Sequence, residues 1–256
     1  MKHVTAVYFS PTKGTKKYVE ALAAALDENY DSVDLTKMAV RTEDHVFGSD
    51  DLVIFGAPVY AGRLPILPEG IFDRIKGGNT PAVFTVTYGN REFDDALLEM
   101  KNTCEENGFR GIAAAAFLAE HTYSGKLAGG RPDKADLAET ADFAKKIESA
   151  LEEMNDSAEL CIPGNYPYKQ AKRLPMRTET GESCVECGLC ARVCPVGAIM
   201  DTADFPADME KCIGCLSCVK SCLRGARLVK DPGLAAIRER LEPALAGIHK
   251  ENQYFL

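Results

Sequence analysis

Eight of the ten cysteines in this chain occur in two copies of one spacing. In each copy two residues separate successive members of a trio, and three residues precede a fourth cysteine. The first copy comprises Cys184, Cys187, Cys190 and Cys194, and the second comprises Cys212, Cys215, Cys218 and Cys222. A 4Fe-4S cube needs a thiolate at each of four irons, and the short spacers allow a tight loop to bring three sulfurs to one cube. The spacing therefore predicts two 4Fe-4S clusters.

The fourth cysteine of each copy is expected to bind the cluster of the other copy, as in two-cluster ferredoxins. This exchange defines two ligand sets, which we call cysteine set 1 and cysteine set 2. Set 1, for cluster 1, is Cys184, Cys187, Cys190 and Cys222, and set 2, for cluster 2, is Cys194, Cys212, Cys215 and Cys218. The exchange would tie the two copies together.

The two copies are an internal duplication. A shift of 28 residues aligns the four cysteines of one copy with those of the other. It also aligns Ala198 with Ala226, which follow the fourth cysteine of their copies at the same distance. Leu223 takes the place of Pro195 in the second copy. This exchange removes a fixed φ beside a ligand and would change the exposure or potential of a cluster without removing the ligand itself.

Zinc and disulfide bonds are the alternatives, since Cys-x-x-Cys pairs also bind tetrahedral zinc and eight thiols can form four bridges. Zinc modules separate their two pairs by a long loop and have no use for a third and fourth thiol close by. A disulfide framework requires export, and the apolar run at residues 4–9 is too short for a signal peptide. We therefore expect a reducing, cytoplasmic location. Cys104 and Cys161 fit neither copy and are expected to be buried thiols.

The composition allows one ordinary hydrophobic core and a small module stapled by cofactors, in a chain of 256 residues that is 46% hydrophobic. The net charge of −8 argues against a nucleic-acid partner and suits a carrier that meets basic patches on a redox partner. The longest apolar stretch, residues 112–119, is far shorter than the about 20 residues of a membrane span. We expect a soluble protein with no membrane span.

Residues 1–154 alternate apolar, β-rich runs with helical patterns, which predicts an α/β domain with a parallel sheet. Five strands are expected, at 4–9, 32–34, 52–57, 82–87 and 112–118, and helices are expected at 17–26, 94–107 and 134–153. Residues 155–180 are expected to be a connector, 181–230 the cluster-binding module, and 231–256 a helical tail. The connector carries tyrosines and basic residues that suit covering a flavin or meeting an acidic partner, or it is a solvated linker.

Open parallel sheets bind ligands at the carboxyl ends of their strands, so the loops after the first, third and fourth strands are the candidate site. The first loop places hydroxyls and a glycine before a helix, where amides favour a phosphate, although helix capping explains such residues equally well. Tyr60 or Tyr88 would stack on a flat ring, or each is a half-buried loop aromatic. The candidate ligand-binding residues are Ser10, Thr12, Lys13, Gly14 and Thr15, then Pro58, Val59, Tyr60, Ala61 and Gly62, and finally Thr87, Tyr88, Gly89 and Asn90. A flavin fits these three loops taken together.

At these residues the chain resembles flavodoxins, and its cysteine copies resemble bacterial ferredoxins with two clusters. Their union is similar to the EFR-type flavodoxin-ferredoxin fusion family of anaerobes, on the motifs at residues 9–12, 58–65, 88–91, 120–124 and 164–169. The resemblance implies a flavodoxin-like sheet of strand order 2-1-3-4-5, FMN and two 4Fe-4S clusters. Lys13 and Gly14 stand where flavodoxins have glycine and then a free position. Either Lys13 takes a strained positive φ or its ammonium pairs with the FMN phosphate.

Three functions are compatible with these residues. The first is an iron-sulfur flavoprotein that transfers electrons between its clusters and FMN and on to a redox partner protein. The second is a flavin-dependent reductase of a small organic substrate, with His121, Tyr123 or Arg91 as proton donor or anchor. The third is a ferredoxin whose flavodoxin-like part is a scaffold without flavin.

Overall fold

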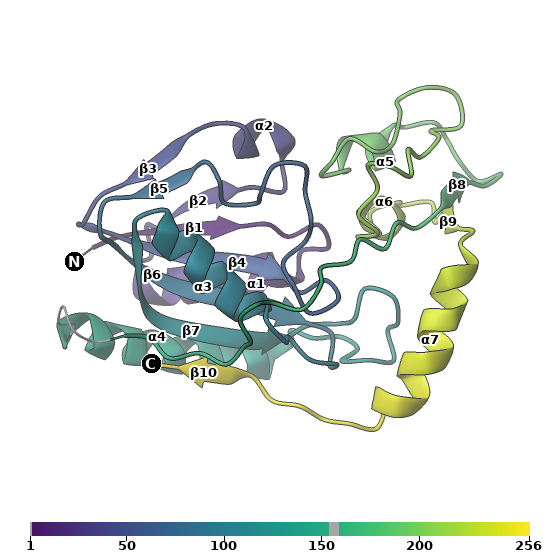
Figure 1. Cartoon of the computed structure of the whole chain (residues 1–256). Helices are drawn as coiled ribbons and strands as arrows, with labels where there is room; N and C mark the ends of the chain where they lie inside the picture. Colours follow the sequence, from purple (N-terminus) through teal and green to yellow (C-terminus); the bar gives the residue numbers. More distant parts are fainter. Residues whose placement is uncertain (1, 154–158) are drawn as a thin grey trace.

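The computed structural model describes residues 2–153 and 159–256. Its larger part is a six-stranded sheet in the order β10-β7-β6-β4-β1-β2 (Figure 1). Five strands run parallel, and β10 pairs antiparallel with β7. The strands are β1 (His3–Tyr8), β2 (Asp31–Asp34), β4 (Asp51–Pro58), β6 (Thr80–Tyr88), β7 (Phe109–Leu118) and β10 (Gln253–Phe255).

The sixth strand corrects two expectations. The expected count of five strands is too low, and the tail at 231–256 is not wholly helical, because its last residues form β10. Tyr254 of β10 packs its ring against Phe117 and Phe143. Three residues were too short a run to show the alternation that identifies a strand in the sequence. The expected boundary between 154 and 155 lies outside the described residues.

Helices cover both faces of the sheet, which explains why β6 is buried along its whole length. α1 (Gly14–Leu26) and α4 (Lys134–Glu152) pack on one face and α3 (Ala96–Glu106) on the other (Figure 1). On the first face Tyr18 of α1 stacks on Phe117 of β7, with ring centroids 4.3 Å apart. Asp133 caps α4 and forms a capping box with Asp136. These layers hold the carboxyl ends of the parallel strands at one edge.

Short elements complete the α/β part. α2 (Met38–Arg41) follows β2, and β3 (His45–Phe47) pairs in parallel with β5 (Ile75–Gly77) in a separate two-stranded sheet. Cys104 is buried, as expected, but Cys161 is exposed, so the expectation of a buried thiol is wrong there. Cys161 lies in irregular chain beyond α4, where there is no amphipathic periodicity from which its burial could be predicted.

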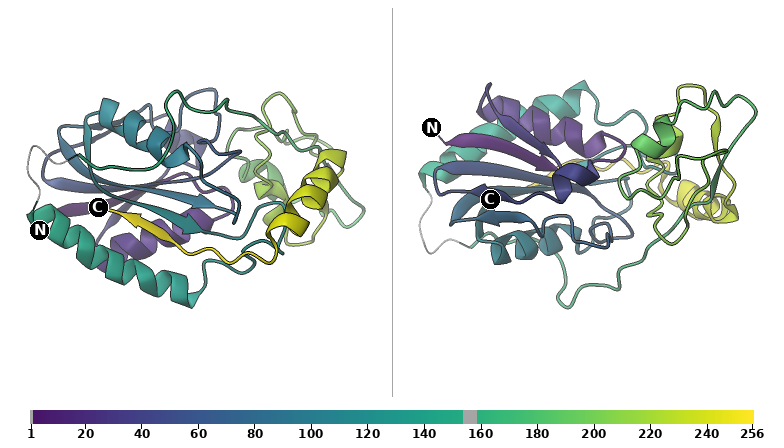
Figure 2. Two further views of the ribbon diagram at one scale, coloured as in Figure 1. Left: turned by 60° about the horizontal axis from the view of Figure 1, so that its bottom comes forward. Right: turned by 90° about the horizontal axis from the view of Figure 1, so that it is seen from above.

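The cysteine-rich module consists of residues 178–229 and lies beyond the carboxyl ends of the sheet strands (Figure 2). β8 (Thr178–Thr180) and β9 (Arg227–Val229) pair antiparallel. α5 (Leu189–Arg192) and α6 (Ser217–Lys220) each contain the third cysteine of a trio. Helix α7 (Pro232–Leu245) then leads the chain back towards the sheet. The duplication is therefore visible as one single-turn helix per copy.

Side-chain contacts join the module and its flanking segments to the α/β part. Asp95 accepts bonds from the backbone N–H groups of Asn165 and Lys169 in the connector. Glu242 of α7 accepts from Ser124 and pairs with Lys126. The connector is therefore anchored on the domain surface rather than being only a solvated linker.

Arg41 makes a further contact between the α/β part and the module, which the sequence did not reveal. This buried guanidinium donates to Leu35 O at 2.6 Å and to Pro195 O of the module at 2.7 Å.

No helix in the described part of the chain is both long enough and apolar enough to span a bilayer.

Candidate functional site

Cysteine set 2 is brought together by the fold of the module. Burial raises the pKa of the Cys215 thiol, and the neighbouring thiols of Cys194, Cys218 and Cys212 raise it further. The pKa of Cys218 is likewise raised, first by burial and then by Cys194 and Cys212. Cys194 comes from the first copy and the other three from the second, so the structure joins the members across the copies.

Cysteine set 1 is more open. Burial raises the pKa of Cys190, and the nearby Cys184 contributes to the rise. Cys187 is exposed. The Cys222 thiol has a lowered pKa, because backbone N–H groups, including those of Arg227 and Ala226, outweigh its desolvation. A sulfur that accepts several N–H bonds is stabilised as a thiolate, the form that binds iron.

The two copies present the fourth cysteine in the same way. Ala198 N donates to Cys194 Sγ at 3.1 Å, and Ala226 N donates to Cys222 Sγ at 3.2 Å. Within residues 2–153 and 159–256, no group of three or more His, Cys, Asp or Glu side chains is arranged around a single metal ion. A four-iron cube takes each thiolate at a different iron and so needs them further apart. The donor sets fit 4Fe-4S clusters in type, number and backbone support.

A pocket of about 340 Å³ opens at the carboxyl ends of β1, β4 and β6. Its size lies in the range of cofactor sites. Twelve of the fourteen candidate residues line it, and the two that do not are Lys13 and Asn90. His121, Tyr123 and Arg91, the candidate substrate residues, also line it. The three strand-end loops therefore converge on one cavity.

The two residues outside the pocket have other surroundings. The Lys13 side chain is exposed, and its backbone has φ 67° and ψ 1°. Lys17, one turn further along α1, lines the pocket instead. Asn90 donates its amide N–H groups to Leu245 O and Ile248 O, and so fastens the end of α7. The sequence placed Asn90 in the site because it could not show where the chain returns from α7.

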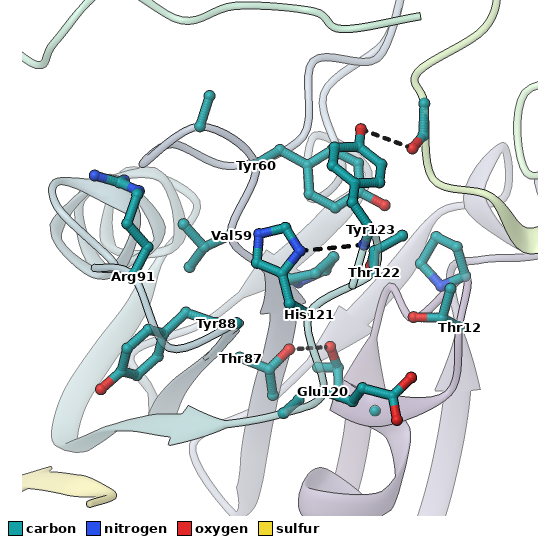
Figure 3. Close-up of a pocket in the computed structure, with 18 of the residues that line it drawn as sticks. Thr12, Val59, Tyr60, Thr87, Tyr88, Arg91, Glu120, His121, Thr122 and Tyr123 are labelled. Carbon is teal, nitrogen blue, oxygen red and sulfur yellow. Dashed lines mark hydrogen bonds between the residues drawn. The ribbon is translucent and has the colours of Figure 1, made fainter. Parts of the chain in front are cut away.

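The loop at 10–15 has the features of a phosphate site. Lys13, the N-cap residue of α1, makes no side-chain cap, and the first N–H groups of a helix have no partner within the helix. Ser10 Oγ instead accepts from Lys16 N at 2.9 Å, and Thr15 Oγ1 lies 2.6 Å from Thr87 Oγ1 across the pocket floor (Figure 3). Helix capping therefore explains one hydroxyl of this loop, that of Ser10, which caps the N–H of Lys16. The helix dipole and the amides of Gly14 and Thr15 favour an anion there.

The two candidate stacking tyrosines differ. Tyr88 is only 2% exposed, and its ring packs edge-on against Phe93 at 5.6 Å. Figure 3 shows this ring turned away from His121. Tyr60 remains at the cavity wall, on a tight turn in which Tyr60 and Arg63 bond to each other's backbone. The Tyr88 ring is therefore part of the apolar core, and Tyr60 is the better placed of the two to stack on a flavin.

His121 is held as a neutral ring. Its Nδ1 accepts from Tyr123 N at 3.1 Å (Figure 3). Burial, aided by the nearby cations Lys220 and Arg91, lowers the pKa of His121 to about 4. The neutral ring therefore carries its proton on Nε2. His121 also fills the space beside Gly89, where a Cβ would lie 2.6 Å from its ring.

The pocket and cysteine set 2 share a wall. Ile213 and Gly214, which lie between Cys212 and Cys215 in sequence, line the pocket. Tyr123 Oη donates to Gly214 O at 3.0 Å. Burial raises the pKa of Tyr60 well above its ordinary value, and Cys215, Tyr123 and Cys212 add to the effect.

Several lining residues were missed in the sequence. They come from the connector, the module and α7, and are Lys172, Leu174, Ile213, Gly214, Lys220, Ile237, Arg240 and Leu241. Ile213 and Gly214 lie inside a Cys-x-x-Cys spacer and carried no separate signal. The others required knowledge of how the module sits on the sheet. The pocket is thus built by both parts of the chain.

The fold and the two sites define an iron-sulfur protein in which a cysteine-rich module closes the ligand pocket of an α/β domain. Residues 177–223 match the family model of the 4Fe-4S dicluster domain. The chain therefore contains a ferredoxin-type 4Fe-4S domain, which accounts for the cysteine copies. No curated protein is significantly similar to the chain.

Solved structures similar to the chain resemble its α/β part. A flavodoxin from the domain Archaea is 18% identical with a TM-score of 0.40, covering 58% of this chain and 99% of its own. A putative flavoprotein from Bacteroides uniformis is 12% identical with a TM-score of 0.37, covering 56% and 98%. An NADH:FMN oxidoreductase in its apo form is 15% identical with a TM-score of 0.37, covering 61% and 92%. Because these TM-scores are low, the description of the fold and of the site depends on the sheet topology and the pocket, not on these structures.

Proposed function

We propose that the protein is an iron-sulfur flavoprotein that transfers electrons between two 4Fe-4S clusters and FMN and on to a redox partner protein. Cysteine sets 1 and 2 would hold the clusters, and the loops at the carboxyl ends of β1, β4 and β6 would hold FMN. FMN exchanges two electrons singly while each cluster carries one, so the bound groups convert between two-electron and one-electron chemistry. Membership in the EFR-type fusion family and a cytoplasmic location are part of this proposal.

The shared wall is the observation that carries the proposal. Gly214 belongs both to the spacer of cysteine set 2 and to the pocket, and Tyr123 bonds to its carbonyl oxygen. A group in the pocket is thus separated from the set 2 sulfurs by little more than this backbone and the rings of Tyr60 and Tyr123. Such closeness suits electron transfer between the two groups.

The surface around cysteine set 1 would be the binding surface for a redox partner protein. Leu223, next to Cys222, is 93% exposed, and Val185, next to Cys184, is 58% exposed. Glu182 and Glu186 are exposed in the same segment. A basic protein surface would complement these apolar and acidic side chains. Electrons would then pass between the partner, cluster 1, cluster 2 and FMN, in either direction.

Cofactor content tests the first part of the proposal. Protein purified without oxygen is expected to contain about eight irons, as much acid-labile sulfide, and one FMN per chain. About eight irons without flavin, even after incubation with FMN, would leave the alternative of a ferredoxin on a flavin-free scaffold. Zinc in place of iron would refute the cluster assignment.

Rapid mixing tests the order of the centres. With a one-electron reductant, cluster bleaching is expected to precede flavin reduction in the wild type. Cys187→Ser, in the exposed set 1, should slow the reduction of the flavin by a protein donor. Flavin reduction that proceeds at the same rate in a variant without either cluster would contradict an intramolecular route.

A reductase acting on a small organic substrate is the second candidate, and His121 is the observation that favours it. Its neutral ring offers an Nε2–H donor at the pocket wall. Such a donor would orient a carbonyl or similar acceptor beside the flavin. Reoxidation of the reduced protein by a panel of small acceptors tests this, with His121→Asn expected to lower kcat/KM for the acceptor while leaving flavin reduction by the clusters unchanged.

A further inference from the structure

Arg227 is a buried arginine in the middle of the cysteine-rich module. It is 2% exposed and is the first residue of β9. The duplication offset of 28 residues aligns it with Ile199, which is also buried. The second copy thus carries a cation where the first copy has an apolar side chain. An arginine in such a position calls for a compensating negative charge.

The described residues do not supply that charge. Arg227 Nε donates to Thr178 Oγ1 at 3.0 Å, and Nη1 donates to Phe205 O at 2.7 Å. Nη2 is buried and has no partner among the described residues. All the partners are neutral, and no carboxylate of residues 2–153 or 159–256 forms an ion pair with this guanidinium. An unpaired buried charge of this kind costs several kcal/mol unless an anion joins it.

Arg227 reaches both cysteine sets. Its backbone N–H donates to Cys222 of set 1. On the side of set 2, Nε donates to the hydroxyl of Thr178, and Thr178 lines the same small cavity as the four cysteines of that set. The guanidinium therefore lies between the two ligand sets.

We propose that Arg227 is a shared counter-charge for the two clusters, which raises both reduction potentials. The inference rests on the proposed cluster content. Reduction of each cluster adds one negative charge, and a nearby buried cation with free N–H groups stabilises that charge. One cation between two centres favours the first electron in either cluster. Only the second copy supplies such a counter-charge, because the equivalent residue of the first copy, Ile199, has no charge.

Redox titration followed by electron paramagnetic resonance tests the proposal on the intact, cluster-loaded protein. Arg227→Met is expected to shift the ratio of reduced to oxidised cluster at a fixed potential about tenfold towards oxidised, for both clusters. For a one-electron couple this is a fall of about 59 mV in each potential. Arg227→Lys should recover most of the shift, since it keeps the charge. Arg224→Met is the matched control, because Arg224 is exposed on the same loop and is screened by water.

The outcomes separate this inference from the proposed function. Arg227→Met protein with about eight irons and unchanged potentials would overturn the inference, as would a shift equal to that of Arg224→Met. If Arg227→Met loses iron, Arg227→Gln decides. Glutamine removes the positive charge but keeps an amide N–H that can donate to Phe205 O, so it should still lower both potentials. Two unchanged potentials there would overturn the inference, whereas wild-type protein without iron would refute the proposed function itself.

Discussion

Replacement of Lys13 by glycine is expected to stabilise the protein. Lys13 has φ 67° directly before α1, and this left-handed conformation costs a residue with a Cβ about 1–2 kcal/mol. Glycine adopts it freely but makes the unfolded chain more flexible, which offsets about 0.4–1 kcal/mol. The net gain in unfolding free energy is therefore about 0.5–1 kcal/mol, or about 1–4 °C in Tm for a chain of this size.

Anaerobic thermal unfolding measures this gain, followed by circular dichroism and by flavin release. Free FMN is held at one concentration, because a bound ligand adds to apparent stability. Lys13→Ala is the matched control. It removes the same ammonium but keeps the Cβ and its strain, so its stability should stay within about 0.5 kcal/mol of the wild type.

FMN affinity distinguishes the strain from a role for the ammonium. The Lys13 side chain is exposed and outside the pocket, so both variants should bind FMN within about threefold of the wild type. A lysine that paired with the phosphate would contribute about 1.5–3 kcal/mol, and both variants would then lose tenfold or more in affinity. That loss, or an equal gain in Tm from Lys13→Ala, would refute the reasoning.

Three further predictions follow from the site. Tyr60→Leu should weaken FMN binding about threefold to tenfold, since aromatic stacking is worth about 0.5–1.5 kcal/mol; an unchanged Kd in flavin titrations would place the ring elsewhere. Arg41→Leu should lower the unfolding free energy by about 1–3 kcal/mol, because it leaves buried carbonyls such as that of Pro195 without a donor; urea midpoints measure this, with the exposed Arg74→Leu as a nearly neutral control. The pKa of His121 is about 4 in the folded protein and about 6.5 unfolded, so the unfolded state binds more protons between these values. Stability should therefore fall by about 1–3 kcal/mol as pH drops from 6.5 to 4, and His121→Asn should flatten this slope.

The sequence by itself determined the elements and the chemistry of the ligands. Each cysteine copy is a local pattern, and its spacing specifies a 4Fe-4S domain whatever the rest of the chain does. The buried strands β4 and β6 and the loops that follow them were likewise readable, because periodicity and strand-end position are local properties. Tyr60, Gly62 and Thr87 were placed at the pocket on this basis.

Only the tertiary structure decided which of these residues face one another. Tyr88 follows the same kind of strand as Tyr60, yet its ring enters the core, because the pleat at the end of β6 directs it towards Phe93. β10 pairs with β7 across more than 130 residues of chain, and the shared wall at Gly214 depends on how the module docks. The hydrogen bonds of Arg227 to Thr178 and Phe205 are equally non-local. Contacts between distant segments arise from packing, and no short window of sequence contains them.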